Sequence, residues 1–430
     1  MSGPTIAYAG MTHLGLCSAV AAASKGFQTI AFSPDRGLVD ALGNGRLPVS
    51  EPGLDDLVRT HRGRLHFTAD PQRLATADVV YVAPDVATDD TGASDLRPLE
   101  SLLELVLAHT GPRTVVVILS QVEPGFTRAH LRQGRSIYYQ VETLIFGRAV
   151  ERATLPERFI VGCADPVQPL DSALAAFLGA FGCPILPMRL ESAELAKISI
   201  NFCLVASVSV ANTLAEVCER IGADWSEIVP ALRLDRRIGP HAYLAPGLGI
   251  AGGNLERDLA TVLRIARAHP IDTGVVEAWI ANSRHRKDWT ARVVTDELLA
   301  RNPDARIAVL GLAYKENTHS TKNSPALACL KALEGHDLAV FDPVVKGDVV
   351  PFARAAVSAL DCAAQADALM VLTPWPEFRA IAVADLAAVM RGRLVIDPYR
   401  LLDTEALLAA GFDYITLGVP PRRAKGRDNA

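Results

Sequence analysis

The arrangement that most constrains this chain is a short apolar run that ends at a glycine and leads into a helical pattern. It occurs at residues 5–10 and again at residues 306–311. A strand that passes through a glycine turn into a helix is the start of a βαβ unit. Further apolar runs alternate with helical patterns after each start, which predicts parallel strands covered by helices on both faces.

The expected strands are continuous apolar runs, at residues 5–9, 29–32, 79–83, 114–119 and 159–162, then 306–311, 338–341, 368–372 and 394–396. Between the two groups, residues 192–220 contain neither Pro nor Gly and repeat apolar residues at helical spacing, which predicts one long helix. We therefore predict an α/β fold with two Rossmann-like, doubly wound parallel-sheet domains. They span residues 1–190 and 301–430, and a long central helix and a helical middle domain at 191–300 join them.

Composition excludes several classes of protein. Lys and Arg number 43 and Asp and Glu 48, a net charge of −5, which argues against a nucleic-acid partner. Half the residues are hydrophobic, so the chain can bury large cores. The seven cysteines include no C-x-x-C pair, so we expect no disulfide framework, no metal site and a cytoplasmic location. We also expect no secretory signal and no membrane-spanning segment.

The first glycine turn resembles a dinucleotide fingerprint, G-x-G-x-x-G. Gly10 and Gly15 occupy the first and third glycine positions, whereas Thr12 replaces the middle one. The turn therefore predicts either a site for NAD or NADP, in which the Thr12 side chain crowds the closest approach, or a simple turn with tight helix packing.

The end of the second expected strand is where such a site usually carries Asp or Glu for the ribose. Ser33 holds that position here, and Asp35 and Arg36 follow shortly after it. Three readings remain open: Ser33 and Arg36 accommodate a 2′-phosphate, the ribose contact has been lost, or Asp35 and Arg36 form a solvated turn.

Five separated stretches together resemble the UDP-glucose/GDP-mannose dehydrogenase family, in the order found there and over nearly the whole chain. They are residues 44–54 (NGRLPVSEPGL), residues 120–125 (SQVEPG), residues 193–197 (AELAK) with Asn201, residues 237–239 (RIG), and residues 311–315 (GLAYK) with Thr318 and residues 321–325 (TKNSP).

The resemblance implies an N-terminal domain that binds NAD, a long helix that carries a homodimer contact, and a C-terminal domain that holds the nucleotide of a nucleotide sugar. Members of the family oxidise the C6 alcohol twice, through an aldehyde, to a carboxylate. A cysteine captures the aldehyde and makes the second oxidation possible.

The aligned position of that cysteine is Asn254. The family pattern G-F-G-G-S-C-F-P-K-D corresponds to residues 249–258 (GIAGGNLERD). An amide is not a nucleophile, so covalent capture is not expected there. Asn254 also stands directly before a helical pattern that ends at Pro270, so it is either an N-cap or a substrate contact at C6.

The other family positions give the remaining candidates. Lys197 and Asn201, one turn apart on the long helix, correspond to the pair that stabilises the oxyanion and orients water. Glu142 and Asp258 correspond to acid–base groups. Ser120 and Gln121 lie in the loop beside the cofactor, and Gln121 replaces the threonine that places the water. The expected substrate contacts are Arg237, Gly252, Gly253, Lys315 and Lys322, and surface lysines are the alternative for the last two.

Three functions follow from these residues. The first is an NAD(P)-dependent oxidoreductase that acts on a nucleotide sugar, most simply a UDP-sugar, without the four-electron reaction. It stops at the aldehyde, oxidises another carbon, or oxidises transiently as an epimerase. The second is a sugar-acid-forming dehydrogenase that uses water in place of thiolate. The third is a non-catalytic nucleotide-sugar-binding paralogue, suggested by the changes at Thr12, Ser33 and Asn254.

Overall fold

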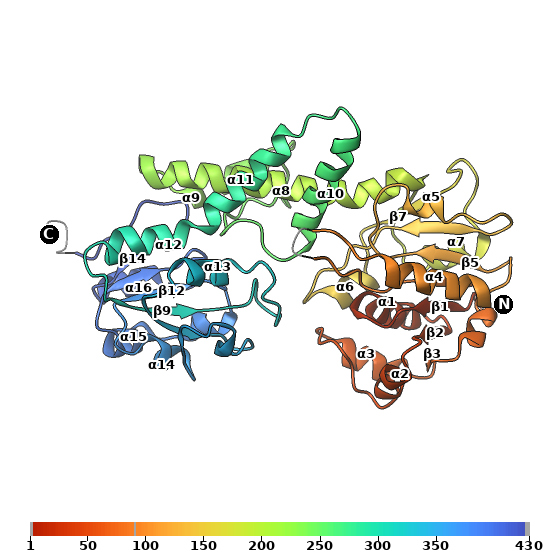
Figure 1. Ribbon diagram of the computed structural model, residues 1–430, viewed down its shortest axis with the longest axis horizontal. Coiled ribbons are helices and arrows are strands. Elements are labelled where there is room, and N and C mark those ends of the chain that lie inside the picture. The colour runs from red at the N-terminus through yellow and green to blue at the C-terminus, as the bar shows by residue number, and fades with distance from the viewer. Residues whose placement is uncertain (1–2, 90–91, 426–430) are drawn as a thin grey trace. The chain divides into compact units, whose positions relative to one another are not determined.

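A computed structural model describes residues 3–89 and 92–425 of the chain. The chain divides into two compact units, Met1–Ile200 and Asn201–Ala430. Each unit contains one β-sheet, and helix α8 (Leu190–Ile221) runs across the boundary between them (Figure 1). The predicted fold class, two Rossmann-like sheets linked by a long helix and a helical middle region, is confirmed.

The first unit is built on an eight-stranded sheet in the order β3-β2-β1-β4-β5-β6-β7-β8. Its strands are β1 (Ile6–Ala9), β2 (Thr29–Phe32), β3 (Leu65–Thr68), β4 (Val79–Val82), β5 (Val115–Ile118), β6 (Ile137–Gln140), β7 (Phe159–Cys163) and β8 (Ile185–Arg189). All neighbouring strands are parallel except the antiparallel pair β6 and β7. Because β1 and β4 are adjacent while β2 lies on the other side of β1, the strand order reverses at β1. A ligand of such a sheet binds at this reversal, beyond the carboxyl ends of the strands.

Helices cover both faces of this sheet (Figure 1). They are α1 (His13–Ser24), α2 (Arg36–Gly43), α3 (Leu54–Thr60), α4 (Arg97–His109), α5 (Phe126–Ala129), α6 (Ala149–Thr154) and α7 (Ser172–Gly179), with a 3-10 turn at Pro71–Thr76. Successive residues of β1 point to opposite faces. Ile6 and Tyr8 therefore pack in the core under α1 and α7, whereas Ala7 and Ala9 pack in the core under α4 and the start of α8.

The second unit holds a six-stranded, all-parallel sheet in the order β11-β10-β9-β12-β13-β14. The strands are β9 (Arg306–Leu310), β10 (Asp337–Phe341), β11 (Arg354–Ala355), β12 (Ala368–Val371), β13 (Leu394–Ile396) and β14 (Asp413–Ile415). Its helices are α9 (Trp225–Leu234), α10 (Asn254–Ala268), α11 (Gly274–Lys287), α12 (Trp289–Val294), α13 (Pro325–Ala332), α14 (Ala359–Ala363), α15 (Val383–Val389) and α16 (Thr404–Ala409). A π-turn at Thr295–Leu299 and 3-10 turns at Gly347–Val349 and Pro376–Ala380 complete it.

Every expected strand is present, with ends that differ by at most a residue. The strands that the sequence did not indicate are β3, β6, β8, β11 and β14, and four of these lie at sheet edges. An edge strand is covered on fewer sides, so it needs fewer apolar residues: only two of the five residues of β8 are even partly buried.

The long helix bears on the expectation of no membrane-spanning segment. Residues 198–215 of α8 are uncharged, and α8 is long and apolar enough to cross a membrane by length and composition alone. A core helix of a soluble protein passes the same test, so this is weak evidence. Part of α8 is buried in the protein: Leu190 and Ala193 pack on the first sheet, and Ala211 and Ala215 pack around Trp225 in the second unit.

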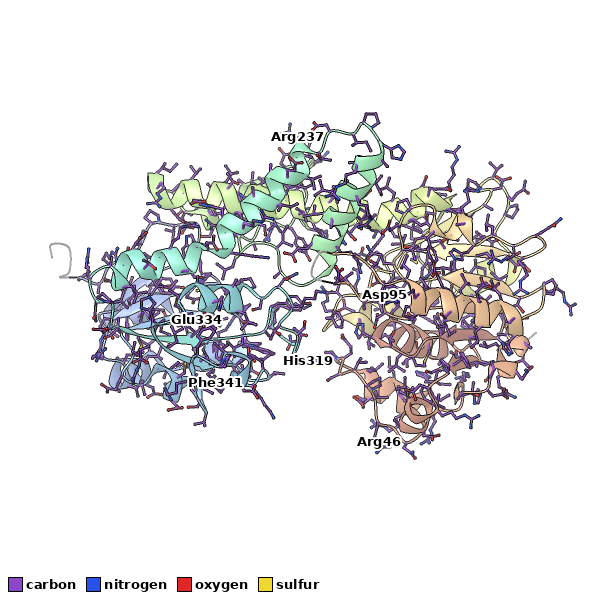
Figure 2. All side chains as sticks on the ribbon, viewed as in Figure 1. Arg46, Asp95, Arg237, His319, Glu334 and Phe341 are labelled. Atoms are coloured by element: carbon purple, nitrogen blue, oxygen red, sulfur yellow. The ribbon has the colours of Figure 1, made fainter. Side chains whose placement is uncertain are left out.

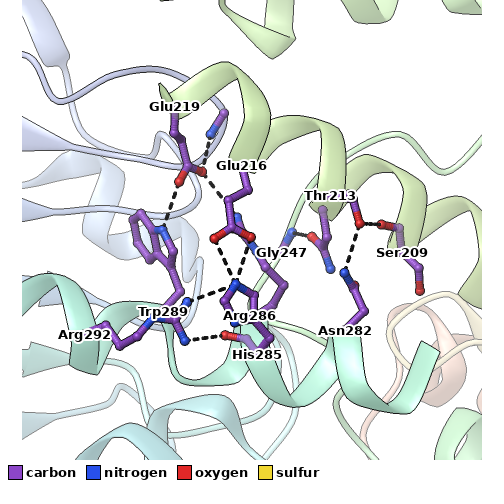
Figure 3. A network of polar contacts seen from close by, with 12 residues as sticks. Ser209, Thr213, Glu216, Glu219, Gly247, Asn282, His285, Arg286, Trp289 and Arg292 are labelled. Carbon is purple, nitrogen blue, oxygen red and sulfur yellow. Dashed lines mark hydrogen bonds and ion pairs between the residues drawn. The ribbon is translucent and has the colours of Figure 1, made fainter. Parts of the chain in front are cut away.

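A buried arginine joins α8 to the rest of the second unit (Figure 3). The side chain of Arg286 on α11 is 0% exposed and lies between two carboxylates of α8, 3.4 Å from Glu216 and 3.3 Å from Glu219. Glu219 also accepts hydrogen bonds from Trp289 Nε1, at 3.1 Å, and from the backbone N–H of Gly418, at 2.9 Å. One carboxylate thus connects α8, α11, α12 and the segment after β14.

Candidate functional site

The glycine turn after β1 has the close packing of a dinucleotide fold. Gly10 has φ +100°, and a Cβ there would lie 2.8 Å from the backbone nitrogen of Pro84. A Cβ on Gly15 would lie 1.8 Å from the carbonyl oxygen of Gly10. Both positions therefore require glycine, and together they bring the N-terminus of α1 against the ends of β1 and β4. This part of the predicted cofactor site fits a dinucleotide.

The N-terminus of α1 also holds a carboxylate of the protein itself. Thr12 is the N-cap residue, but its Oγ1 makes no cap bond and instead accepts a hydrogen bond from Asp85 N, at 2.8 Å. The carboxylate of Asp85 in turn accepts a hydrogen bond from the backbone N–H of His13, at 3.0 Å. A bound diphosphate normally occupies this end of the helix. The turn therefore fits the cofactor at its two glycines, and its helix N-terminus holds the Asp85 carboxylate.

His13 and Glu51 form a buried pair beside the same turn. Nε2 of His13 lies 2.8 Å from Oε1 of Glu51, and both side chains are less than a tenth exposed. The His13 ring stacks on Phe146 at 4.2 Å, and Glu51 also accepts the backbone N–H groups of Gly147 and Ala149. The pair joins the first turn of α1 to the loop that leads into α6.

The predicted ribose-binding residues adopt local roles at the end of β2. Ser33 is buried, and its Oγ accepts a hydrogen bond from Asp35 N, at 3.3 Å. Asp35 is the N-cap of α2 and accepts a hydrogen bond from Leu38 N, at 3.1 Å. Arg36 is exposed as the first residue of α2. Asp35 thus serves as a helix cap, while Ser33 lies at the strand end where a ribose would bind.

The loop after β5 supports the loop after β4. Ser120 is 0% exposed, and its hydroxyl donates a hydrogen bond to the carbonyl oxygen of Pro84, at 2.5 Å. Gln121, the next residue, is partly buried. The two predicted residues of this loop therefore lie beside the same strand ends as the glycine turn.

Glu142 and Lys197 meet in the first unit. Lys197 Nζ lies 3.1 Å from a carboxylate oxygen of Glu142 and donates a hydrogen bond to its carbonyl oxygen, at 3.0 Å. Their side chains are 17% and 11% exposed, so the ammonium group is largely shielded from water. The neighbouring Glu194 of α8 accepts the backbone N–H groups of Gly125 and Thr127, which fastens α8 to the loop after β5.

Asn201 and Asp258 meet in the second unit. Asn201 Nδ2 donates a hydrogen bond to Asp258 at 2.5 Å, and Asp258 is 1% exposed. Arg257, also buried, places its Nε 3.4 Å from the same carboxylate. The amide of Asn201 and the guanidinium of Arg257 therefore both act on Asp258.

The glycine-rich loop before α10 is tightly held, and it corrects the predicted role of Asn254. A Cβ on Gly249 would lie 2.4 Å from the carbonyl oxygen of Ser283, and one on Gly252 would lie 3.1 Å from the Tyr314 ring. Gly253, not Asn254, is the N-cap residue of α10. Asn254 is the first residue of the helix and is exposed, without a side-chain cap bond. The N-cap prediction was wrong by one residue.

Glu256 holds this loop in place from the first turn of α10. It forms an ion pair with Lys287 Nζ of α11 at 2.7 Å and accepts a hydrogen bond from the side-chain amide of Asn323. Asn323 also donates to the carbonyl oxygen of Gly252, at 2.8 Å. These contacts fix the backbone at Gly252 and Gly253, two of the predicted substrate contacts.

The remaining predicted substrate residues lie in loops of the second unit. Lys315 and Lys322 are partly buried, and Lys315 Nζ lies 5.8 Å from the centroid of the Tyr314 ring. Arg237, which follows α9, is exposed (Figure 2) and forms an ion pair with Asp235 at 2.6 Å.

Burial disfavours the thiolate form at six of the seven cysteines. Burial raises the pKa of Cys17 and of Cys362 to about 12 each and that of Cys329 to about 11. Burial also raises the pKa of Cys163, Cys183 and Cys218, whereas Cys203 is exposed on α8. Across residues 3–89 and 92–425, no group of three His, Cys, Asp or Glu side chains is arranged to hold a metal ion.

Sequence reasoning missed Asp85, His13, Glu51 and Glu256. The signal for Asp85 was its position just after a buried strand, β4, because the carboxyl ends of adjacent parallel strands meet. Glu51 was visible within the family-like stretch at residues 44–54. Glu256 falls within the family-like stretch at residues 249–258, at the position where the family pattern has a proline.

Three models of one family match successive segments of the chain. The NAD-binding domain of the UDP-glucose/GDP-mannose dehydrogenase family matches residues 4–174, its central domain residues 191–284, and its UDP-binding domain residues 308–404. The first segment, which contains the glycine turn, is therefore an NAD-binding domain of this family.

Relatives match over nearly the full length. UDP-glucose 6-dehydrogenase TuaD of Bacillus subtilis (strain 168) is 28% identical, with 97% of this chain and 94% of that protein covered. UDP-glucose 6-dehydrogenase of Rhizobium meliloti (strain 1021) is 29% identical, with 96% and 98% covered.

A solved structure has the same fold. The UDP-glucose dehydrogenase of Pyrobaculum islandicum superposes with a TM-score of 0.83 at 23% identity, covering 97% of this chain and 98% of that one. With the three matched domains in order and the two glycine-turn sheets, the chain belongs to the UDP-glucose/GDP-mannose dehydrogenase family.

Proposed function

We propose that the protein is an NAD-dependent oxidoreductase that oxidises an alcohol of a UDP-sugar and stops after the first, two-electron step. The residue that carries this proposal is Asn254, which aligns with the cysteine of the family pattern that residues 249–258 resemble. Asn254 is the first residue of α10, its side chain is exposed, and it lies four residues before Asp258. An amide there can donate or accept a hydrogen bond but cannot capture an aldehyde covalently.

No other thiol is a good substitute. Every cysteine with a shifted pKa has it raised, which disfavours the thiolate that acts as nucleophile. Cys203 lies six residues after Lys197 on α8, and at about 100° per residue it points away from the Lys197 face. The first oxidation needs no thiol, whereas the second does in this family.

The chain retains groups suited to the first step. NAD, when bound, accepts the hydride from the alcohol carbon. The Lys197 ammonium, shielded from water beside Glu142, stabilises the alkoxide that forms as the hydroxyl proton leaves. Glu142, beside Lys197, is the carboxylate assigned to take this proton. In the second unit, Asp258 is assigned as a further acid–base group, and Asn201 donates a hydrogen bond to it. Lys315, Lys322 and Arg237, together with the loop at Gly252 and Gly253, are assigned to the nucleotide and sugar.

The test is to incubate the purified protein with UDP- and GDP-sugars and either NAD or NADP, and to identify the products by mass spectrometry and NMR. We expect a UDP-sugar to lose two hydrogen atoms with NAD. The absence of turnover with every sugar would contradict the proposal.

A second candidate is a nucleotide-sugar-binding protein without activity. The observation that favours it is the Asp85 carboxylate at the N-terminus of α1, together with Thr12 in the middle-glycine position. Calorimetry that detects a UDP-sugar but no dinucleotide would support this candidate over the first.

We further propose a homodimer formed through α8. Val210, Leu214, Val217 and Ile221 are 42–70% exposed. Their spacing of four, three and four residues places them on one face of the helix, as in helix–helix seams. A second copy of the chain would cover this stripe.

Replacement of Leu214 by Glu is expected to convert the dimer to a monomer, because the carboxylate would be buried in the apolar seam. Light scattering after size-exclusion chromatography measures the mass. Val357→Glu is the matched control, since Val357 is 87% exposed and lies outside α8. If Leu214→Glu keeps the wild-type mass, or the wild-type is already monomeric, the α8 interface is wrong.

We also assign residues 1–190 to cofactor binding, 191–300 to dimerisation and 301–430 to the nucleotide sugar. The three matched family domains fall within these limits. A cytoplasmic location is in keeping with seven free cysteines.

A further inference from the structure

We propose that Asp85 is an internal competitor for the dinucleotide: its carboxylate holds the N-terminus of α1 in the free protein and must leave when a diphosphate binds there. This inference rests on the assignment of the first unit to NAD. It adds a residue that controls the affinity for the dinucleotide, and it assigns a structural role to Thr12.

The loop after β4 is held by three hydrogen bonds, two of them to the glycine turn. Asp85 N donates to Thr12 Oγ1, at 2.8 Å, and Asp85 Oδ2 accepts from His13 N, at 3.0 Å. From the other side, Ser120 Oγ donates to the carbonyl oxygen of Pro84, at 2.5 Å. We call the two bonds between Asp85 and residues 12–13 the Asp85 latch. Thr12 in the middle-glycine position therefore supplies one half of the latch.

The latch occupies one of the groups that a diphosphate would use, the backbone N–H of His13. A helix N-terminus attracts an anion through its free backbone N–H groups and its partial positive charge. In this turn the N–H of His13 already donates to a carboxylate. A diphosphate that approaches the same N–H group meets a like charge at hydrogen-bonding distance, so the two anions cannot both bind there.

The neighbouring charges add to this competition. His13 stabilises the Asp85 carboxylate, whereas Glu142 opposes it, and burial contributes most to the raised pKa of Asp85. His13 is itself bonded to Glu51, and Lys197 to Glu142. Both of these side chains thus already have acidic partners when the diphosphate arrives.

The test is calorimetric titration of the full chain with NAD, ADP-ribose and adenosine. Asp85→Asn removes the charge and keeps an oxygen that can accept from His13 N, so the fold is preserved. We expect it to bind NAD and ADP-ribose about tenfold more tightly than the wild type, and adenosine equally. Thr12→Gly, which removes the other half of the latch, is expected to act in the same direction. Because both changes open one latch, the double variant should gain less than the sum.

Asp171→Asn is the matched control, because Asp171 also caps a helix of the first unit, through Ala173 N at 2.9 Å. Its affinities should equal those of the wild type. Equal NAD affinity of Asp85→Asn and wild type would overturn the competition and leave the NAD assignment intact. No dinucleotide binding by either protein would overturn both. An equal gain for adenosine would indicate general loosening of the turn and would also overturn the proposal.

Discussion

Replacement of Lys197 by Met is expected to lower kcat for sugar oxidation by about 100- to 1,000-fold, with a much smaller change in KM. The Lys197 side chain is 11% exposed and its ammonium group lies against Glu142, so its charge is only weakly screened by water. It stabilises the developing alkoxide more than the neutral alcohol, and for that reason its loss acts on kcat. Met retains the length and apolar body of the side chain.

Steady-state formation of NADH measures this effect. Lys331→Met is the control, because Lys331 is 72% exposed and pairs with Glu334, one turn away on the surface. A Lys197→Met variant that retains kcat within about threefold would remove Lys197 from the proposed chemistry.

Replacement of Glu219 by Ala is expected to lower the free energy of unfolding by about 3–5 kcal/mol. The change leaves Arg286, which is fully buried, with Glu216 as its remaining carboxylate, 3.4 Å away. It also removes the acceptor of Trp289 Nε1 and of the Gly418 N–H group (Figure 3). A buried donor without a partner adds to the cost of the lost charge.

Denaturant unfolding of the full chain, followed by circular dichroism, measures the loss. Glu334→Ala removes an exposed carboxylate instead and should change the free energy of unfolding by less than about 1 kcal/mol. A loss of that small size for Glu219→Ala would mean that the buried network contributes little to stability.

The sequence predicted features that depend on neighbouring residues. Gly10 and Gly15 were assigned to the strand–turn–helix, and the structure shows that a Cβ at either would collide with backbone. Helix α8 extends over the predicted stretch because neither Pro nor Gly interrupts it. Periodicity and turn residues are local signals, so the elements that they predict do not depend on distant contacts.

Features that depend on distant pairs were not predicted. Asp85 reaches the α1 N-terminus from 72 residues away, because β4 lies next to β1 in the sheet. Glu256 finds Lys287 and Asn323 through the packing of α10. The N-cap of α10 was predicted at Asn254 but lies at Gly253, because both Gly and Asn are favourable at an N-cap.

The most direct test of the central claim is the number of NADH molecules formed per UDP-sugar oxidised, with hydroxylamine present to trap any aldehyde as an oxime. Because position 254 carries an amide and not a thiol, we expect one NADH per sugar and a product with the mass of the oxime. Two NADH per sugar and a sugar carboxylate would contradict the account, because the second oxidation would then proceed without a thiol at this position.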